Sequence, residues 1–335
     1  MSGGRQELKY RGGNDQGGYP ENTALPGTAT RWKRFILLAF LFFIFVYTVI
    51  TGVLSMNYAG QVIHPPQTKA PPINRNIAHR YVSVSFKSGD GAIQLYGWHF
   101  NAKKTTDALI IVHGFGGNRF PFGEQTLDLI EAVIAIDFNV LAFDLRNSGG
   151  SGTGISTFGL HEMNDVKGAV DYMRGAGYTN IAVLGVSTGA GAAALAGAAM
   201  PMEDVGALIL DSPIVDTGRF IMHLLREKRP GLPEFPFDAI VPVLTGVYIN
   251  GVVADADVGT SLDGFIPRNV QLIYGNNDEI VSLDEIMGLY NGYMGRAVGK
   301  ISIWNVPGAG HGECYAVARE EYIDRVATFL RRVFM

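Results

Sequence analysis

The sequence is poor in cysteine and in charge. Cys314 is the only cysteine among 335 residues, so the chain forms no internal disulfide bond and no cysteine-built zinc site. Charged residues make up 17 % of the chain, with 27 basic and 31 acidic side chains, and no basic stripe runs along the folded part. We therefore expect no nucleic-acid partner. No H-E-x-x-H or comparable cluster occurs, so we expect neither a metal nor a cofactor.

The N-terminal region combines a polar tail with a long apolar run. Residues 1–34 are rich in glycine and polar side chains, end in the basic RWKR, and are predicted to be disordered. Residues 35–54, FILLAFLFFIFVYTVITGVL, match the roughly 20 uncharged residues that a helix needs to cross a bilayer. A buried core helix would rarely be apolar all round, and a cleaved signal peptide would end in an A-x-A-like site that is missing here. We therefore predict an uncleaved transmembrane helix.

The basic residues beside this helix predict its orientation. Arg31, Lys33 and Arg34 precede the span directly, whereas the first basic residue after it is Lys69. By the positive-inside rule the tail lies in the cytoplasm, and the rest of the chain lies on the extracytoplasmic side of the membrane. Residues 55–79 contain four prolines and are predicted to form an extended linker.

Residues 80–335 alternate between strand and helix patterns. Two alternating segments, 81–87 and 92–100, flank the turn sequence SGDG and predict a β-hairpin. The continuous apolar runs that follow are typical of strands buried on both faces of a parallel sheet. These runs are 108–112, 139–143, 181–184, 207–210, 270–274 and 301–304, and helical patterns cover 121–136, 161–174, 191–199, 283–290 and 315–333. The alternation predicts an α/β fold with a mostly parallel sheet and helices on both faces.

One interval departs from this alternation. No clean strand pattern occurs over residues 212–268, which contain six prolines and short apolar segments such as FIMHLL. Such a long interval in a compact domain is usually functional. We expect a small inserted cap here.

The sequence NIAVLGVSTGAGAAA, residues 180–194, contains a G-x-S-x-G motif between a β-branched run and an alanine-rich segment. This spacing is that of a nucleophile elbow, in which Ser187 stands on a tight turn between a strand and a helix. Gly185 and Gly189 leave room for the two backbones, which crowd together at such a turn. Ser187 is therefore the candidate nucleophile.

A serine nucleophile needs a base and an acid, which follow it along the chain in hydrolases with this elbow. His311 lies in PGAGHGEC after the last predicted strand, and Asp278 lies in GNNDEIV after the preceding one. Both emerge at the carboxyl edge of the sheet, as Ser187 does. Glu279 and Asp211 remain alternatives to Asp278 as the acid.

An oxyanion hole needs two N–H donors near the nucleophile. The backbone N–H of Thr188, the residue after the serine, is one candidate, and the N–H of Phe115 in the sequence HGFGGN is the other. His113 is expected to shape this loop rather than to catalyse. Asp144 and Arg146, in FDLRNSGGSG, are expected to hold the neighbouring loop through a buried polar contact.

Taken in order, the motifs HGFGGN, DLRNSGGSG, GVSTG, GNNDEIV and GAGHGE make residues 80–335 resemble an α/β-hydrolase. Within that superfamily the chain is similar to membrane-anchored serine hydrolases of the prolyl-oligopeptidase and serine-aminopeptidase-like branch. It departs from their pattern at Asn147 and Ser148, where Gly-His is common, and at Thr188, Gly189 and Ala190, which replace Met-Gly-Gly. Neither change removes a catalytic atom.

The residues and the resemblance together predict a membrane-anchored serine hydrolase that cleaves carboxylic esters, including lipid or acylglycerol esters, through an acyl-enzyme. A peptidase or a thioesterase on the same residues, and a non-catalytic hydrolase-like binding module, are the alternatives. A dinucleotide-binding motif, G-x-G-x-x-A from Gly189 with Asp211 beyond it, is weaker because Gly189 comes several residues after the strand ends.

Overall fold

The computed structural model describes residues 28–73, 81–102, 105–249 and 258–335, so the predicted tail up to residue 27 lies outside the described residues. The chain divides into two units, Met1–Ile50 and Thr51–Met335. Helix α1 (Thr28–Ile63) runs through the boundary between them and is longer than the predicted span at both ends. It continues into the expected linker because the first proline after the span is Pro65.

Among the described residues, α1 is the one helix that is long and apolar enough to cross a membrane. The apolar stretch covers Thr30–Ile63. From residue 51 onward one side of the helix is buried, and Ala59 and Val62 belong to the hydrophobic core of the second unit. The last three turns of α1 therefore form part of the folded body.

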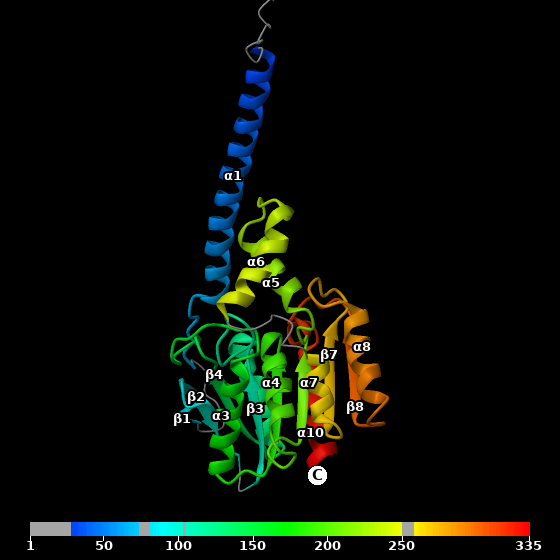
Figure 1. The fold of residues 1–335 in the computed structure, drawn as a ribbon. Helices are drawn as coiled ribbons and strands as arrows, with labels where there is room; N and C mark the ends of the chain where they lie inside the picture. Colours follow the sequence, from blue (N-terminus) through cyan, green and yellow to red (C-terminus); the bar gives the residue numbers. More distant parts are fainter. Residues whose placement is uncertain (1–27, 74–80, 103–104, 250–257) are drawn as a thin grey trace, which may run out of the picture. The chain divides into compact units, whose positions relative to one another are not determined.

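The body contains an eight-stranded sheet in the order β1-β2-β4-β3-β5-β6-β7-β8 (Figure 1). Strands β1 and β2 form the predicted hairpin, β2 pairs antiparallel with β4, and all other neighbours are parallel. The mostly parallel sheet expected from the sequence is thus confirmed. The strands are β1 (Tyr81–Lys87), β2 (Gln94–Phe100), β3 (Asp107–Val112), β4 (Asn139–Asp144), β5 (Asn180–Val186), β6 (Ala207–Asp211), β7 (Asn269–Gly275) and β8 (Ile301–Val306).

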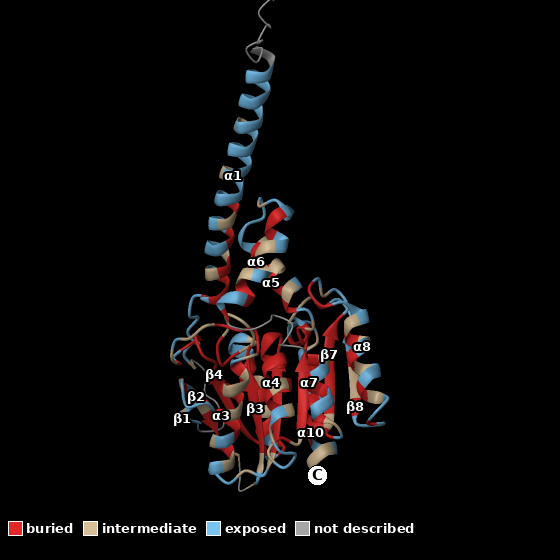
Figure 2. Ribbon diagram, in the orientation of Figure 1, coloured by how far each residue is buried: buried red, intermediate tan, exposed pale blue. Residues whose placement is uncertain are grey.

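Side chains of the parallel strands alternate between two hydrophobic clusters, one on each face of the sheet. In β3, Ile110 and Val112 belong to one cluster, and Leu109 and Ile111 belong to the other. Figure 2 shows the strands buried beneath helices whose outer sides are exposed. Because successive side chains of a strand point to opposite faces, an uninterrupted apolar run fills both layers.

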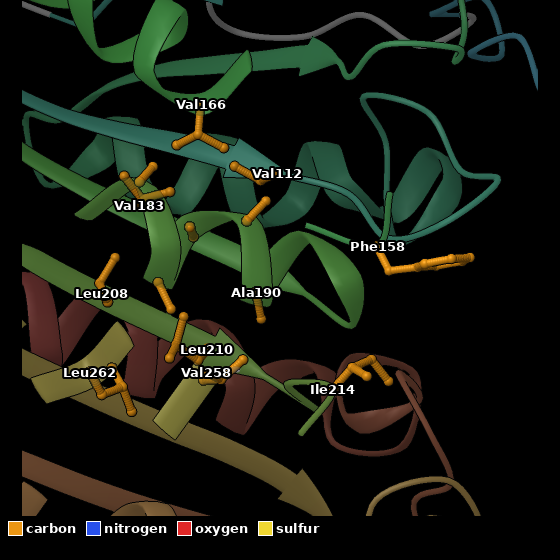
Figure 3. Packing of buried hydrophobic residues seen from close by; sticks show 14 of the residues in the cluster. Val112, Phe158, Val166, Val183, Ala190, Leu208, Leu210, Ile214, Val258 and Leu262 are labelled. Atoms are coloured by element: carbon orange, nitrogen blue, oxygen red, sulfur yellow. The ribbon is translucent and has the colours of Figure 1, made fainter. Parts of the chain in front are cut away.

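Helices cover both faces of this sheet. The first cluster contains residues of α3 (Glu162–Gly175), α4 (Thr188–Ala199), α7 (Val258–Phe265) and α8 (Leu283–Met294). The second contains residues of α2 (Thr126–Ala135), which follows the 3-10 turn η1 (Gly123–Gln125), and of α9 (Cys314–Val317) and α10 (Arg319–Phe334). Figure 3 shows part of the first layer, with Val183 and Leu208 from adjacent strands, Ala190 from α4, and Val258 and Leu262 from α7.

The interval between β6 and β7, where the sequence predicts a cap, contains α5 (Thr217–Lys228), α6 (Glu234–Tyr248) and α7. Residues 250–257 of the interval lie outside the described part of the chain. Helix α7 packs on α4 within the layer that covers the sheet, whereas α5 and α6 pack on each other beyond the carboxyl ends of the strands (Figure 1). The segment that can cover a site at this edge therefore consists of α5 and α6.

Candidate active site

Ser187 stands between β5 and α4 in a strained backbone conformation. Its φ of 56° and ψ of −122° lie outside the regions that side-chain-bearing residues usually adopt. The surrounding backbone is tightly packed: a Cβ atom on Gly185 would lie 2.5 Å from the carbonyl oxygen of Gly189, and one on Gly189 would lie 2.2 Å from that of His113. The two glycines allow this close approach, which leaves the Ser187 hydroxyl at the carboxyl edge of the sheet.

His311 follows β8 and lies next to this serine. Its Nε2 is 2.8 Å from the Oγ of Ser187, and its Nδ1 is 2.8 Å from the Oδ2 of Asp278, which follows β7. The Asp278 side chain is 1 % exposed and that of His311 is 15 % exposed, so their hydrogen bond is shielded from solvent while the imidazole still reaches the surface of the site. The structure therefore brings the three residues into one hydrogen-bonded chain.

The environment of Asp278 favours its ionised form. Burial raises its pKa, but the hydrogen bond from His311, the charge on that ring and the backbone N–H groups of Val281 and Ile280 outweigh burial, so the pKa lies below its ordinary value. The two N–H groups donate to Oδ1 at distances of 2.9 and 2.8 Å, which leaves Oδ2 for the imidazole. A carboxylate held in this way stays negative and orients the ring.

The other two acid candidates do not reach the imidazole. Glu279 is exposed. Asp211 is fully buried at the end of β6, where Ser212 Oγ and Tyr322 Oη donate to its carboxylate, each at 3.0 Å. Ser212 Oγ in turn accepts the N–H of Gly312 at 3.2 Å, so Asp211 supports the loop of the histidine indirectly.

The pKa of Asp211 is shifted in the opposite direction from that of Asp278. Burial raises the pKa of Asp211 to about 6, and the hydrogen bonds from Ser212, Tyr322 and Cys314 only partly offset that effect. The sequence analysis missed Ser212 and Tyr322. The position of Ser212 directly after the candidate acid Asp211 could have indicated it. Tyr322 lies 111 residues after Asp211, and no pattern in the sequence connects the two.

The loop after β3 lies beside the serine. A Cβ atom on Gly114 would lie 3.1 Å from that of Ser187. Among the described residues, the backbone N–H groups of Phe115 and Thr188 have no hydrogen-bond acceptor. Thr188 is the first residue of α4, and the leading N–H groups of a helix lack partners within it. Both groups are therefore free to donate to an oxyanion.

Buried polar contacts hold the loop after β3 in place. His113 is 1 % exposed; its Nε2 accepts the N–H of Leu145 at 3.1 Å, and its Nδ1 lies 2.7 Å from the carbonyl oxygen of Gly114. Burial holds the pKa of His113 below its ordinary value, in keeping with the neutral ring that these contacts need. Asp144 accepts the N–H of Arg119 at 2.8 Å and pairs with its guanidinium.

Asp144 and Arg146 each form a buried ion pair that holds neighbouring segments together. Arg119, on the loop after β3, is the partner of Asp144 that the sequence analysis missed. Arg146 pairs instead with Asp165 of α3 at 2.8 Å. The sequence signal for the first pair is weak, since 25 residues separate the two side chains and neither lies in the G-x-S-x-G motif.

The Ser187 side chain lines a cavity of about 560 Å³. Helix α5 forms one wall, where the ring centroid of Phe220 lies 6.4 Å from that of His311. Further along α5, His223 and Glu227 add polar atoms to the same wall. The cavity has room for an apolar acyl or aryl group next to the serine, with polar contacts at a short distance.

Across the described segments of the chain, no group of three or more histidine, cysteine, aspartate or glutamate side chains could hold a metal ion. The groups that gather at the carboxyl edge are a hydroxyl, an imidazole, a carboxylate and two backbone N–H donors, a set that can perform nucleophilic acyl transfer.

The model of the alpha/beta hydrolase family matches residues 109–328, which is about two thirds of the chain. The chain belongs to the alpha/beta hydrolase family. It is also 24 % identical over 240 residues to the uncharacterized protein YqkD of Bacillus subtilis, a match that covers 70 % of this chain and 74 % of YqkD.

Solved structures share the fold of this hydrolase. The Pyrococcus furiosus esterase Pf2001 superposes with a TM-score of 0.67 over 82 % of this chain and 99 % of the esterase, at 23 % identity. Est1E of Butyrivibrio proteoclasticus, in a structure with bound ferulic acid, gives a TM-score of 0.58 over 75 % of this chain and 99 % of Est1E, at 22 % identity. At these identities the likeness shows the fold.

The two buried carboxylates can be distinguished by matched variants. We expect Asp278→Asn to lower kcat about 10⁴-fold because the amide cannot orient and stabilise the protonated imidazole. Asp211→Asn should lower kcat less than about tenfold, since the amide oxygen can accept from one of the two hydroxyls and the amide NH2 can donate to the other. Steady-state hydrolysis of a soluble ester by the two variants tests this assignment. A larger loss in Asp211→Asn than in Asp278→Asn would contradict it.

Proposed function

We propose that this hydrolase cleaves carboxylic esters through an acyl-enzyme on Ser187. The observation that carries the proposal is the unbroken hydrogen-bond chain from Ser187 through His311 to Asp278, at the wall of a cavity and beside two free N–H donors. The Pyrococcus furiosus esterase Pf2001, which has the same fold, supports an ester as the substrate.

The geometry supports a two-step reaction. In the first step Ser187 Oγ attacks the carbonyl carbon of the ester while His311 Nε2 takes the hydroxyl proton, and Asp278 stabilises the imidazolium. The N–H groups of Phe115 and Thr188 donate to the oxyanion of the tetrahedral intermediate, which collapses as His311 returns the proton to the leaving alkoxide. In the second step, water activated by His311 attacks the acyl-enzyme and releases the acid.

One alternative to ester hydrolysis, an aminopeptidase function, has a candidate residue in the cavity. An aminopeptidase of the resembled branch would need an acidic group to bind the substrate amine. Of the three acidic candidates on the cap, Asp238 pairs with Arg226. Glu227 and Glu234 are both exposed, but only Glu227 lines the cavity. Glu227 is therefore the residue on which a peptidase function would depend.

We further propose that α1 anchors the hydrolase in a membrane, with residues 1–34 in the cytoplasm, residues 35–54 in the bilayer and the hydrolase domain on the other side. The support is the length and apolar composition of α1 and the three basic residues that precede the span. Ile63, where α1 ends, accepts the N–H of Ser156 at 2.9 Å, so the linker begins after a helix end that is attached to the body.

The nucleophile is tested with a fluorophosphonate, which labels activated serines covalently. We expect the wild-type chain to be labelled and Ser187→Ala to lose both the label and at least about 10³-fold in ester hydrolysis, because the acyl-enzyme cannot form. Ser212→Ala, which alters a buried hydroxyl nearby, is the matched control and should still be labelled. Equal labelling of the wild type and Ser187→Ala would show that another residue is the nucleophile.

A substrate panel separates the esterase from the peptidase. For an esterase, Glu227→Gln should change kcat/KM for uncharged short-chain esters less than about threefold, because no cation meets this side chain. For an aminopeptidase, the same variant should lose about tenfold or more on aminoacyl amides, since the substrate ammonium would lose its carboxylate partner. Rates on esters, thioesters and aminoacyl amides are compared, and a selective loss on amides would overturn the ester assignment.

The topology is tested by limited proteolysis of intact cells. Protease added outside should cleave the chain after Leu54 and leave an epitope tag at the N-terminus intact, because the basic flank retains the tail in the cytoplasm. Permeabilised cells are the control in which the tag is also lost. Complete protection of the hydrolase domain in intact cells would contradict the proposed orientation.

A further inference from the structure

Helix α6 presents an uncharged apolar face to solvent. Its inner side is buried through Phe237, Val241 and Thr245, as expected for an amphipathic helix. The outer side carries Val243 at 65 % and Val247 at 68 % exposure, and the sequence from residue 239 to 248, AIVPVLTGVY, contains no charged residue. The outer face of a helix in water normally carries charged side chains. This face therefore has the composition of a surface that contacts an apolar phase.

The start of α6 is attached to the end of α1. The ring of Tyr58, in the part of α1 that belongs to the body, packs edge-to-face on Phe237 with centroids 6.0 Å apart. Ala59 and Val62 share a hydrophobic cluster with Phe237 and Val241. Tyr58 follows Leu54, the last residue of the proposed span, by four residues of continuous helix, which is a rise of about 6 Å. Helix α6 is thereby held next to the point where the chain leaves the bilayer.

The side chains around this contact are those that favour the boundary between membrane and water. The guanidinium of Arg229 lies 5.8 Å from the centroid of the Tyr58 ring, and Lys228 beside it is exposed. Aromatic and basic side chains of this kind favour the depth of the lipid headgroups. Asp238, the acidic residue nearest the apolar face, forms an ion pair with Arg226 of α5.

Helix α5 links this face to the active site. It packs on α6 and lines the cavity of Ser187 with Phe220 and Leu224. We propose that the outer face of α6, residues 239–248, inserts into the lipid leaflet next to the hydrolase domain, and that the cavity takes acyl-chain esters from that leaflet. The proposal rests on the membrane anchor and the ester hydrolysis argued above, and names the bilayer as the partner of α6.

A fluorescence experiment on the full chain tests the insertion. Cys314 is fully buried, so a cysteine introduced at an exposed position can be labelled selectively with the environment-sensitive fluorophore NBD. Val247→Cys probes α6. Val298→Cys, at a residue that is 84 % exposed in the connection before β8, is the matched control at the amino edge of the sheet. Both are reconstituted into phosphatidylcholine vesicles and separated from unbound protein by flotation.

In these vesicles, nitroxide-labelled phosphatidylcholine should quench NBD at residue 247 at least about threefold more than at residue 298, whereas iodide on both sides should quench residue 298 more. Equal iodide quenching at both positions would overturn the insertion. Shielding of residue 247 from both quenchers, increasing with protein density, would indicate a second copy on α6 and would also overturn it. If the chain fails to float with the vesicles, the anchor and the insertion both fail.

An activity ratio tests the route of the substrate. In Val243→Asp/Val247→Asp, hydrolysis of a long-chain ester embedded in vesicles should fall about tenfold relative to hydrolysis of a soluble short-chain ester, because two charges oppose insertion. Val298→Asp should leave the ratio unchanged. An unchanged ratio in the double variant would contradict delivery from the leaflet. If the wild-type chain hydrolyses neither ester, the proposed hydrolysis is refuted. The quenching experiment would then still decide whether α6 inserts.

Discussion

The close contact between β5 and α4 is the constraint on which the candidate site depends. Gly185 and Gly189 let the strand and the helix approach until their backbones touch, and the turn between them forces Ser187 to a φ of 56°. The same contact brings Gly114 against the serine. A bulkier residue at any of the three glycines would push Ser187 away from the loop after β3. The atoms that an added Cβ would meet belong to the backbone or to Ser187, and these atoms cannot move aside easily.

Two buried carboxylates serve this site under opposite electrostatic conditions. Asp278 receives two backbone N–H groups and the imidazole, so its charge is well satisfied and its pKa is low. Asp211 lies deeper, and burial raises its pKa to about 6. Its hydrogen bonds connect it through Ser212 to Gly312 and not to the imidazole, which bonds Asp278. The difference follows from the deeper burial of Asp211, which its hydrogen bonds offset only in part.

The cap helices α5 and α6 connect the cavity of Ser187 to the end of the apolar helix α1. Helix α5 forms a wall of the cavity with Phe220, while α6 lies on α5 and contacts Tyr58 near the end of the apolar helix. One short segment of chain thus has contacts with both the proposed anchor and the site. In the proposed orientation the uncharged outer face of α6 would meet the bilayer, where apolar side chains that are costly to expose to water add stability.

The sequence by itself determined the α/β alternation, the parallel sheet, the apolar helix and the order of Ser187, Asp278 and His311, because periodicity and motif spacing are local along the chain. Only the tertiary structure decided which carboxylate reaches the imidazole, that α7 belongs to the layer on the sheet, and that α1 continues to Ile63. These features depend on contacts between residues far apart in sequence, such as Asp211 with Tyr322, which no local pattern encodes.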